Sequence, residues 1–177
     1  MQELITRAKE LLADGTVARV LGWKAGDLSY NPEAAYFETA ESLDEFVYNG
    51  FCGQNLSKMM IEASKLEGKT LVCLKPCDTY SFNQLIKEHR VDREKAYIIG
   101  VGCKGKLNVE KLREMGIKGI KSISGAELTD ACEELHISTI YGDKTVAYKE
   151  AMLERCHVCK GKEPVSYTHL TLPTTPY

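Results

Sequence analysis

Four of the seven cysteines in this chain have positions that would suit the ligands of a metal cluster. Cys156 and Cys159 form a C-x-x-C pair, whereas Cys77 and Cys103 each follow an apolar run. A four-iron cluster is held by four thiolates, and a close pair combined with two distant residues is a common way to supply them. The sequence therefore predicts an iron–sulfur site with Cys77, Cys103, Cys156 and Cys159 as ligands.

Zinc is the main alternative for this site, because four-cysteine zinc sites are common and a C-x-x-C pair suits them. Zinc ribbons usually contain two close pairs, and here two candidates, Cys77 and Cys103, are isolated. The spacing therefore favours a cluster over zinc. A thiol redox pair is a third alternative for Cys156 and Cys159, but that motif normally opens a helix early in a domain, and this pair comes late.

The other three cysteines are interpreted differently, because free cysteine is among the most buried residue types. Cys73 lies inside an apolar run and Cys132 on the apolar face of an expected helix. Both are expected to be small core residues. Cys52, within Asn49–Gly53, is left undecided.

The elements that position the candidate ligands are two strands of an expected parallel sheet, Thr70–Leu74 and Ala96–Val101. The first is apolar throughout, as strands buried on both faces are, and a helix capped by Asp78 or Thr79 follows it. Right-handed crossovers bring the ends of such strands to one edge, where ligands of open α/β sheets bind. The predicted fold is α/β, a mostly parallel sheet with flanking helices and the cysteine loops at the carboxyl edge of the strands.

The rest of the chain is expected to continue this alternation of strands and helices. The further strands predicted are Ala18–Trp23, Ala34–Thr39, Ile120–Ile123 and Ile137–Tyr141, and the further helices are Met1–Asp14, a helix starting at Ser42, Asn55–Leu66, Val109–Met115, Gly125–Leu135 and Lys149–Arg155. Ile120–Ile123 and Ile137–Tyr141 are expected as the third and fourth strands of the βα series. The last helix would deliver Cys156.

Composition limits the class of protein. Apolar residues make up 44% and charged residues 27% of the chain, as in soluble globular proteins, and the net charge is −2. Nucleic acid is therefore not expected as a partner, because proteins that bind it are usually basic. No apolar run reaches the roughly 20 residues of a membrane span, and the first residues lack the features of a signal peptide. We expect the protein to be located in the cytoplasm. Thiols stay reduced there, so a cysteine-rich pattern indicates metal or redox chemistry.

Residues 1–164 are expected to form a single α/β domain, the N-terminal part of a longer protein. Residues 165–177, VSYTHLTLPTTPY, resemble translated adapter sequence and are expected to be a non-native tail. Lys75, Lys104 and Lys106 flank the cysteine segments. They are expected to be solvated, or to meet a flavin phosphate or an acidic partner protein.

The same segments resemble a known family, the beta subunits of coenzyme F-420 hydrogenases and dehydrogenases, and especially a short branch that ends in a two-cluster ferredoxin module. The segments are VCLKPCD (72–78), DREKAYIIGVGCKG (92–105) and CHVC (156–159), with NGFCGQNL (49–56) as a fourth. The resemblance covers most of residues 40–164. The ferredoxin module itself is missing, and the chain has Pro76 and Gly102 where the branch usually has Gly and Pro.

The resemblance implies a [4Fe-4S] cluster on Cys77, Cys103, Cys156 and Cys159, with FAD or another flavin as a second cofactor. It also implies electron transfer between a flavin or deazaflavin donor and another iron–sulfur subunit, in an anaerobic cytoplasm. The protein is thus expected to be an electron-transfer subunit of an oxidoreductase complex. The alternative is a zinc-stabilised binding or assembly module without redox activity.

Overall fold

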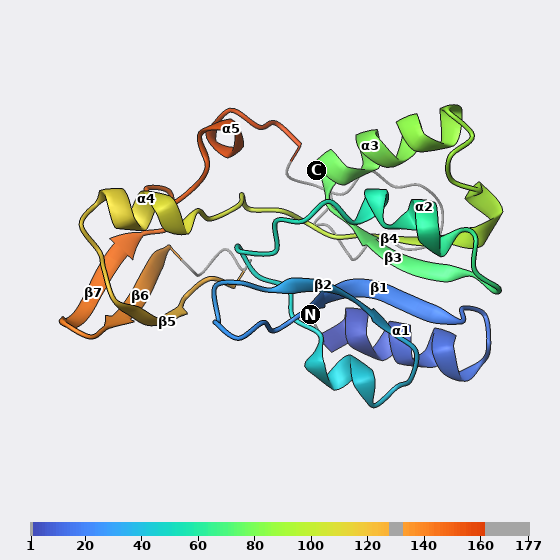
Figure 1. Ribbon diagram of the computed structural model, residues 1–177, viewed down its shortest axis with the longest axis horizontal. Coiled ribbons are helices and arrows are strands. Elements are labelled where there is room, and N and C mark those ends of the chain that lie inside the picture. Colours follow the sequence, from blue (N-terminus) through green and yellow to red (C-terminus); the bar gives the residue numbers. More distant parts are fainter. Residues whose placement is uncertain (1, 128–132, 162–177) are drawn as a thin grey trace.

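Two separate β-sheets organise the chain in the computed structural model, which describes residues 2–127 and 133–161 (Figure 1). The first sheet has the strand order β2-β1-β3-β4 and the second the order β5-β6-β7. The elements are α1 (Gln2–Ala13), β1 (Arg19–Lys24), β2 (Glu33–Phe37), η1 (Ser42–Glu45), η2 (Leu56–Lys58), α2 (Met60–Ala63), β3 (Thr70–Leu74), α3 (Pro76–Lys87), η3 (Arg93–Lys95), β4 (Ala96–Gly100), α4 (Val109–Glu114), β5 (Ile120–Ser124), β6 (Glu134–Thr139), β7 (Gly142–Ala147) and α5 (Glu154–His157).

The four-stranded sheet confirms the predicted α/β class. Strands β1, β3 and β4 are parallel, and β2 pairs antiparallel with β1 at the edge. All five residues of β3 are buried, since helices cover both faces of the sheet: α1 lies on one side, and α2 and α3 on the other (Figure 1). The apolar face of α1, with Leu4, Ala8 and Leu11, packs into the same core. The parallel strands β1, β3 and β4 are mostly buried because helices cover them, whereas the edge strand β2 is largely accessible.

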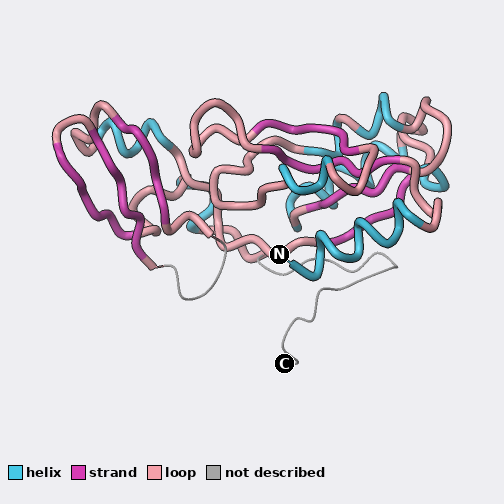
Figure 2. Tube along the Cα trace, turned by 90° about the horizontal axis from the view of Figure 1, so that it is seen from below, coloured by secondary structure: helices cyan, strands magenta, loops and turns pink. Residues whose placement is uncertain are grey.

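The second sheet corrects the predicted third and fourth strands of the βα series. Strands β5, β6 and β7 form an antiparallel sheet of their own, which lies at the other end of the molecule (Figure 2). Buried and accessible residues alternate along β6. Leu135, Ile137 and Thr139 are buried and the residues between them are not, as in a strand with one face covered. A turn at Ile140 and Tyr141 then leads into Gly142, whose φ of +111° favours glycine. Residues 134–147 therefore form a hairpin, which leaves them no crossover helix.

Four predicted helices also differ from the structure. The helix predicted from Ser42 is only the 3-10 helix η1, and the predicted helix Asn55–Leu66 is divided into η2 and the four-residue α2. Residues 125–127 are not helical, Leu135 lies in β6, and residues 128–132, with Cys132, lie outside the described range. Residues 149–153 form turns and a β-bridge, so that the helix at Cys156 is only the four-residue α5. The chain reaches Cys156 by an irregular path because Met152 pairs with Leu107 in an isolated β-bridge.

Each sheet has its own hydrophobic core among the described residues. The larger core surrounds Trp23, Leu74 and Phe82, and the smaller one surrounds Leu112, Leu135 and Tyr148. The division of the chain into one or two domains stays a prediction, and residues 165–177 lie outside the described range. Among the helices that the structure describes, none has both the length and the apolar character of a membrane span.

Candidate metal centre

Cys77 lies at the carboxyl edge of the four-stranded sheet, in the first turn of α3. Strand β3 ends at Leu74 and the helix begins at Pro76, with Lys75 as its N-cap. Proline is favoured at this first helical position because its missing N–H would have no partner there. The helix thus begins before the predicted caps, Asp78 and Thr79, which are buried inside it. The Cys77 side chain is exposed at the helix start.

Cys103 follows the neighbouring strand, as predicted. Leu74 and Gly100 are paired in register at the ends of β3 and β4, so the chain leaves both strands at the same edge. The register of β3 and β4 therefore brings Cys77 and Cys103 to the same edge of the sheet, although 26 positions separate them in the sequence. Although Cys77 is exposed as a residue, partial desolvation of its thiol against the surrounding atoms raises the pKa to about 11, and the neighbouring Asp78 contributes to the rise.

Cys156 is fixed to the segment that follows Cys103. The Lys106 N–H donates a hydrogen bond to Cys156 Sγ at 3.4 Å, and the Leu153 N–H donates to the Lys106 carbonyl at 2.9 Å. A Cβ at Gly105 would lie 3.5 Å from the Cys156 Cβ. These contacts join the C-x-x-C region to the segment carrying Cys103.

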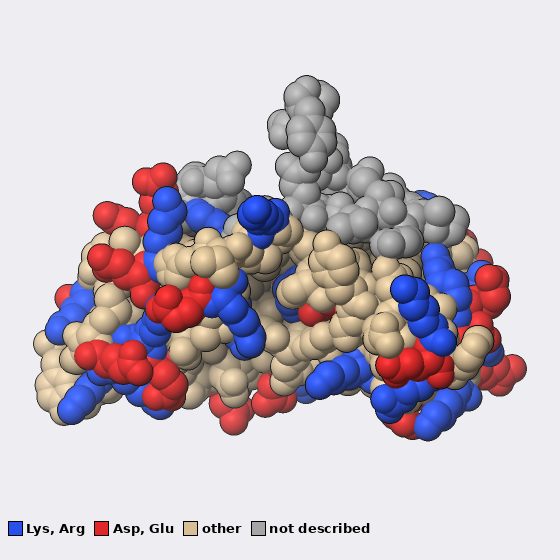
Figure 3. Space-filling model, turned by 90° about the horizontal axis from the view of Figure 1, so that it is seen from above, with Lys and Arg blue, Asp and Glu red and all other residues tan. Residues whose placement is uncertain are grey.

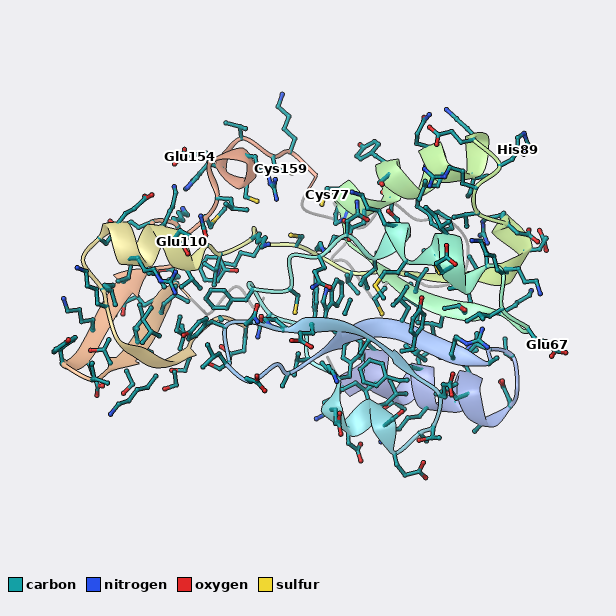
Figure 4. All side chains as sticks on the ribbon, viewed as in Figure 1. Glu67, Cys77, His89, Glu110, Glu154 and Cys159 are labelled. Carbon is teal, nitrogen blue, oxygen red and sulfur yellow. The ribbon has the colours of Figure 1, made fainter. Side chains whose placement is uncertain are left out.

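Cys159 lies where the chain returns to the start of α3. A Cβ added at Gly161 would lie 3.4 Å from the Pro76 Cβ, and Cys159 Sγ lies 3.6 Å from the Gly161 carbonyl oxygen. In Figure 4, the labelled Cys77 and Cys159 both lie in the region between α5 and the beginning of α3. The four predicted ligands thus belong to three segments that meet at one edge of the molecule, which we call the cysteine edge.

Burial separates the six described cysteines into two groups. Cys52 and Cys73 are buried in the larger core, 3% and 0% exposed, and burial raises their pKa values to about 11 and about 12. The four cysteines of the cysteine edge are partly or fully accessible. This difference agrees with the expectation that Cys73 is a core residue. It also places Cys52, left undecided from sequence, in the core.

The donor set suits an iron–sulfur cluster in the chemical kind of its ligands. Cysteine thiolates are the usual ligands of such clusters, and the cysteine edge contains four thiols on backbone segments that contact one another. Within residues 2–127 and 133–161, no three His, Cys, Asp or Glu side chains stand together in the geometry of a metal site. The thiols would therefore have to move closer together to bind a common group.

A buried lysine, Lys75, precedes Cys77 by two positions at the start of α3. The Lys75 side chain is inside the protein, and its Nζ lies 3.0 Å from Asp78 Oδ2. The ammonium also donates to the carbonyls of Cys52, at 3.2 Å, and Gln54, at 2.9 Å. It stands 4.4 Å from the centre of the Trp23 ring. Lys75 therefore fastens residues 52–54 to the first turn of α3.

Two tyrosine hydroxyls hold the loop that carries Cys103. The Tyr48 hydroxyl donates to the Gly102 carbonyl at 2.6 Å, and the Tyr148 hydroxyl donates to the Gly105 carbonyl at 2.9 Å. Tyr48 also stacks on Trp23, with ring centroids 5.2 Å apart, and burial raises its pKa. The backbone on both sides of Cys103 is thus tied to both cores.

Sequence reasoning missed the part played by Lys75, which was expected to be solvated. The signal was present in the sequence, since Lys75 and Asp78 are three positions apart around Pro76. A charged pair three residues apart at a helix start, directly after a fully apolar strand, has little access to water. The roles of Tyr48 and Tyr148 had no local signal, because their partners are backbone carbonyls distant in sequence.

Comparison with known proteins supports the assignment suggested by the cysteine segments. Residues 67–165, more than half of the chain, match the sequence model of a family described as the C terminus of the beta subunit of coenzyme F420 hydrogenase/dehydrogenase. The chain is also similar to the beta subunit of F420-dependent formate dehydrogenase 1 from Methanococcus maripaludis, with 27% identity over 107 residues. That alignment covers 60% of this chain and 28% of the relative.

Among solved structures, the fold is similar to a chain of the F420-reducing [NiFe] hydrogenase complex from Methanosarcina barkeri, determined as a xenon derivative. The TM-score is 0.60 with 17% identity, over 89% of this chain and 62% of that one. At this identity the likeness concerns the fold alone. The present chain spans less than two thirds of the length of either protein.

Proposed function

Because this chain belongs to the coenzyme F420 hydrogenase/dehydrogenase beta subunit family, we propose that it is an iron–sulfur electron-transfer subunit of an oxidoreductase complex. Its ligands would be Cys77, Cys103, Cys156 and Cys159. When bound, a [4Fe-4S] cluster would supply a one-electron carrier between a flavin or deazaflavin donor and another iron–sulfur subunit. FAD or another flavin would be the adjoining cofactor, and the reduced thiols would require a compartment such as the cytoplasm.

The observation that carries this proposal is the placement of the four thiols. They lie on segments that touch one another, they are accessible, and the two described cysteines outside the set are buried in the core. Cysteines that serve only in packing are expected in the core, as Cys52 and Cys73 are, whereas the four thiols lie at the edge of the sheet where α/β proteins bind their ligands. The contact between Lys106 and Cys156 shows that backbone N–H groups can reach these sulfurs. Hydrogen bonds of this type tune the potential of a cluster.

The test is anaerobic reconstitution of the full chain with iron and sulfide, followed by metal analysis and an electron paramagnetic resonance spectrum after reduction. We expect about four irons per chain and a reducible signal. The Cys103→Ser variant should lose the visible chromophore, whereas Cys73→Ala should keep it, because Cys73 is fully buried in the core. A Cys103→Ser protein with an unchanged spectrum would refute this ligand set.

Metal analysis also decides between the proposal and its alternative, a zinc-stabilised binding or assembly module. One equivalent of zinc, without iron or acid-labile sulfide after reconstitution, would favour the zinc module. The four thiols suit both metals, so chemistry alone does not separate them. The redox proposal rests on the family and on the separated positions of Cys77 and Cys103.

A further inference from the structure

The cysteine edge carries an excess of positive charge although the whole chain is slightly negative. Its segments contribute four basic residues: Lys104, Lys106, Arg155 and Lys160. The acidic residues in the same segments are already in ion pairs, Asp78 with Lys75 at 3.0 Å and Glu154 with Lys111. Figure 3 shows the molecule from above, with Lys and Arg side chains and some acidic side chains beside the hollow in the middle of this view. The surface around the four thiols is therefore cationic.

Two of the basic residues, Lys106 and Arg155, lie on segments that contact one another. Lys106 lies beside the segment of Arg155, because the Lys106 N–H donates to Cys156 Sγ at 3.4 Å and the Leu153 N–H donates to the Lys106 carbonyl at 2.9 Å. Lys106 lies directly against the backbone of Gly53, where an added Cβ would be 1.7 Å from its Nζ. Like charges on adjoining segments favour an anionic partner, because the positive potential that they create attracts one.

Apolar side chains are exposed among these charges. Val158, between the two cysteines of the C-x-x-C pair, is 80% exposed. Tyr80, one turn after Cys77 on α3, is 70% exposed. Exposed aromatic and aliphatic residues with charged residues around them are typical of protein–protein interfaces. They are not what an isolated phosphate group needs.

We propose that the cysteine edge is the docking surface for an acidic electron-carrier protein, with Lys104, Lys106, Arg155 and Lys160 steering the partner and Val158 and Tyr80 contacting it. The proposal rests on the proposed function, in that the carrier would exchange electrons with a centre on the four thiols. It adds the identity of the partner by its chemistry, an anionic protein surface around a redox centre. Docking here would bring that centre next to the accessible thiols.

The test is association of the full chain with a strongly acidic two-cluster ferredoxin, measured by stopped-flow or surface plasmon resonance across a range of salt concentrations. The variant is Arg155→Glu/Lys160→Glu, and the control is Lys121→Glu/Lys144→Glu on the three-stranded sheet. All four positions are exposed, so the variants should fold. Electrostatic steering contributes factors of about 10 to 1,000 to association rates. We expect the first variant to associate at least about tenfold more slowly at low salt, and the control to stay within about twofold.

Other results would overturn the proposal. They are an equal effect of the two double variants, an association rate independent of salt, or equal binding of a basic cytochrome c. Binding of pyrophosphate that depends on Arg155 and Lys160, without binding of ferredoxin, would assign the charges to a small anionic ligand instead. Association is measured on both the reconstituted and the metal-free chain. Failure to take up iron would refute the proposed function, whereas the docking proposal is tested separately by the association of the metal-free chain.

Discussion

Replacing Lys75 with Met should destabilise the protein more than any other change of an exposed or buried lysine described above. Lys75 is 6% exposed and Asp78 is 3% exposed, and the Lys75 ammonium pairs with the Asp78 carboxylate. Removing the cation leaves a buried carboxylate unpaired, and it also removes a donor from the carbonyls of Cys52 and Gln54. Breaking a buried pair by removing one partner typically costs about 3–5 kcal/mol. Domains of this kind are stable by only about 5–15 kcal/mol.

The assay is urea unfolding of the metal-free chain, followed by circular dichroism and by the fluorescence of Trp23, the single tryptophan. Trp23 reports directly on the change because the ammonium lies 4.4 Å from the centre of its ring. Lys87→Met is the matched control, since Lys87 is exposed on the same helix and surface changes usually stay within about 0.5 kcal/mol.

A double-mutant cycle tests the reasoning itself. If the cost comes from an uncompensated charge, Asp78→Asn should partly rescue Lys75→Met, with a coupling free energy of about 2 kcal/mol. Additive effects of the two changes would refute an ion pair of this strength. A loss below about 1 kcal/mol for Lys75→Met would show that Asp78 is neutral or that water reaches it.

Two further predictions concern the larger core. Burial raises the pKa of Cys73 to about 12, against about 8.5 for a thiol in the unfolded chain, so the folded state retains the proton between these values and its stability falls as the pH rises through this range. Near pH 10 this loss is about 2 kcal/mol, and Cys73→Ala should give a flatter profile of unfolding free energy against pH; parallel profiles would contradict it. Gly22→Ala should cost about 1–3 kcal/mol in urea unfolding, because its Cβ would lie 2.2 Å from the Phe46 ring. A cost below about 0.5 kcal/mol for Gly22→Ala would show that the Phe46 ring moves aside without strain and would exclude the clash.

The parallel strands were predictable because a short, continuous apolar run is typical of a strand buried on both faces of a sheet. Thr70–Leu74 is buried throughout, and the positions of Cys77 and Cys103 follow from the register of β3 and β4. The antiparallel sheet was misassigned since short strands at similar intervals were read as further βα units. Two local signals indicated the hairpin: the alternation along Glu134–Thr139 and the glycine that ends its turn.

The arrangement of the cysteine edge was predictable only in part. The strand ends bring Cys77 and Cys103 to one side, but the position of Cys156 depends on long-range backbone contacts of Lys106 and Met152. Such contacts use groups that every residue has, and they leave no pattern in the sequence. The same is true of the carbonyls that receive the Tyr48 and Tyr148 hydroxyls.

The two separate hydrophobic cores have a consequence for how the protein opens. Because each core packs around its own sheet, the two sheets are expected to unfold as distinct cooperative units, as parts of proteins with few shared contacts do. Amide hydrogens of β6 should then exchange with solvent faster than those of β3, which lies at the centre of the larger sheet. Cys77 belongs to the slow unit and Cys156 to the fast one, so a group bound by both would add a connection between the two units. Slower exchange in β6 after metal loading would be the sign of that connection.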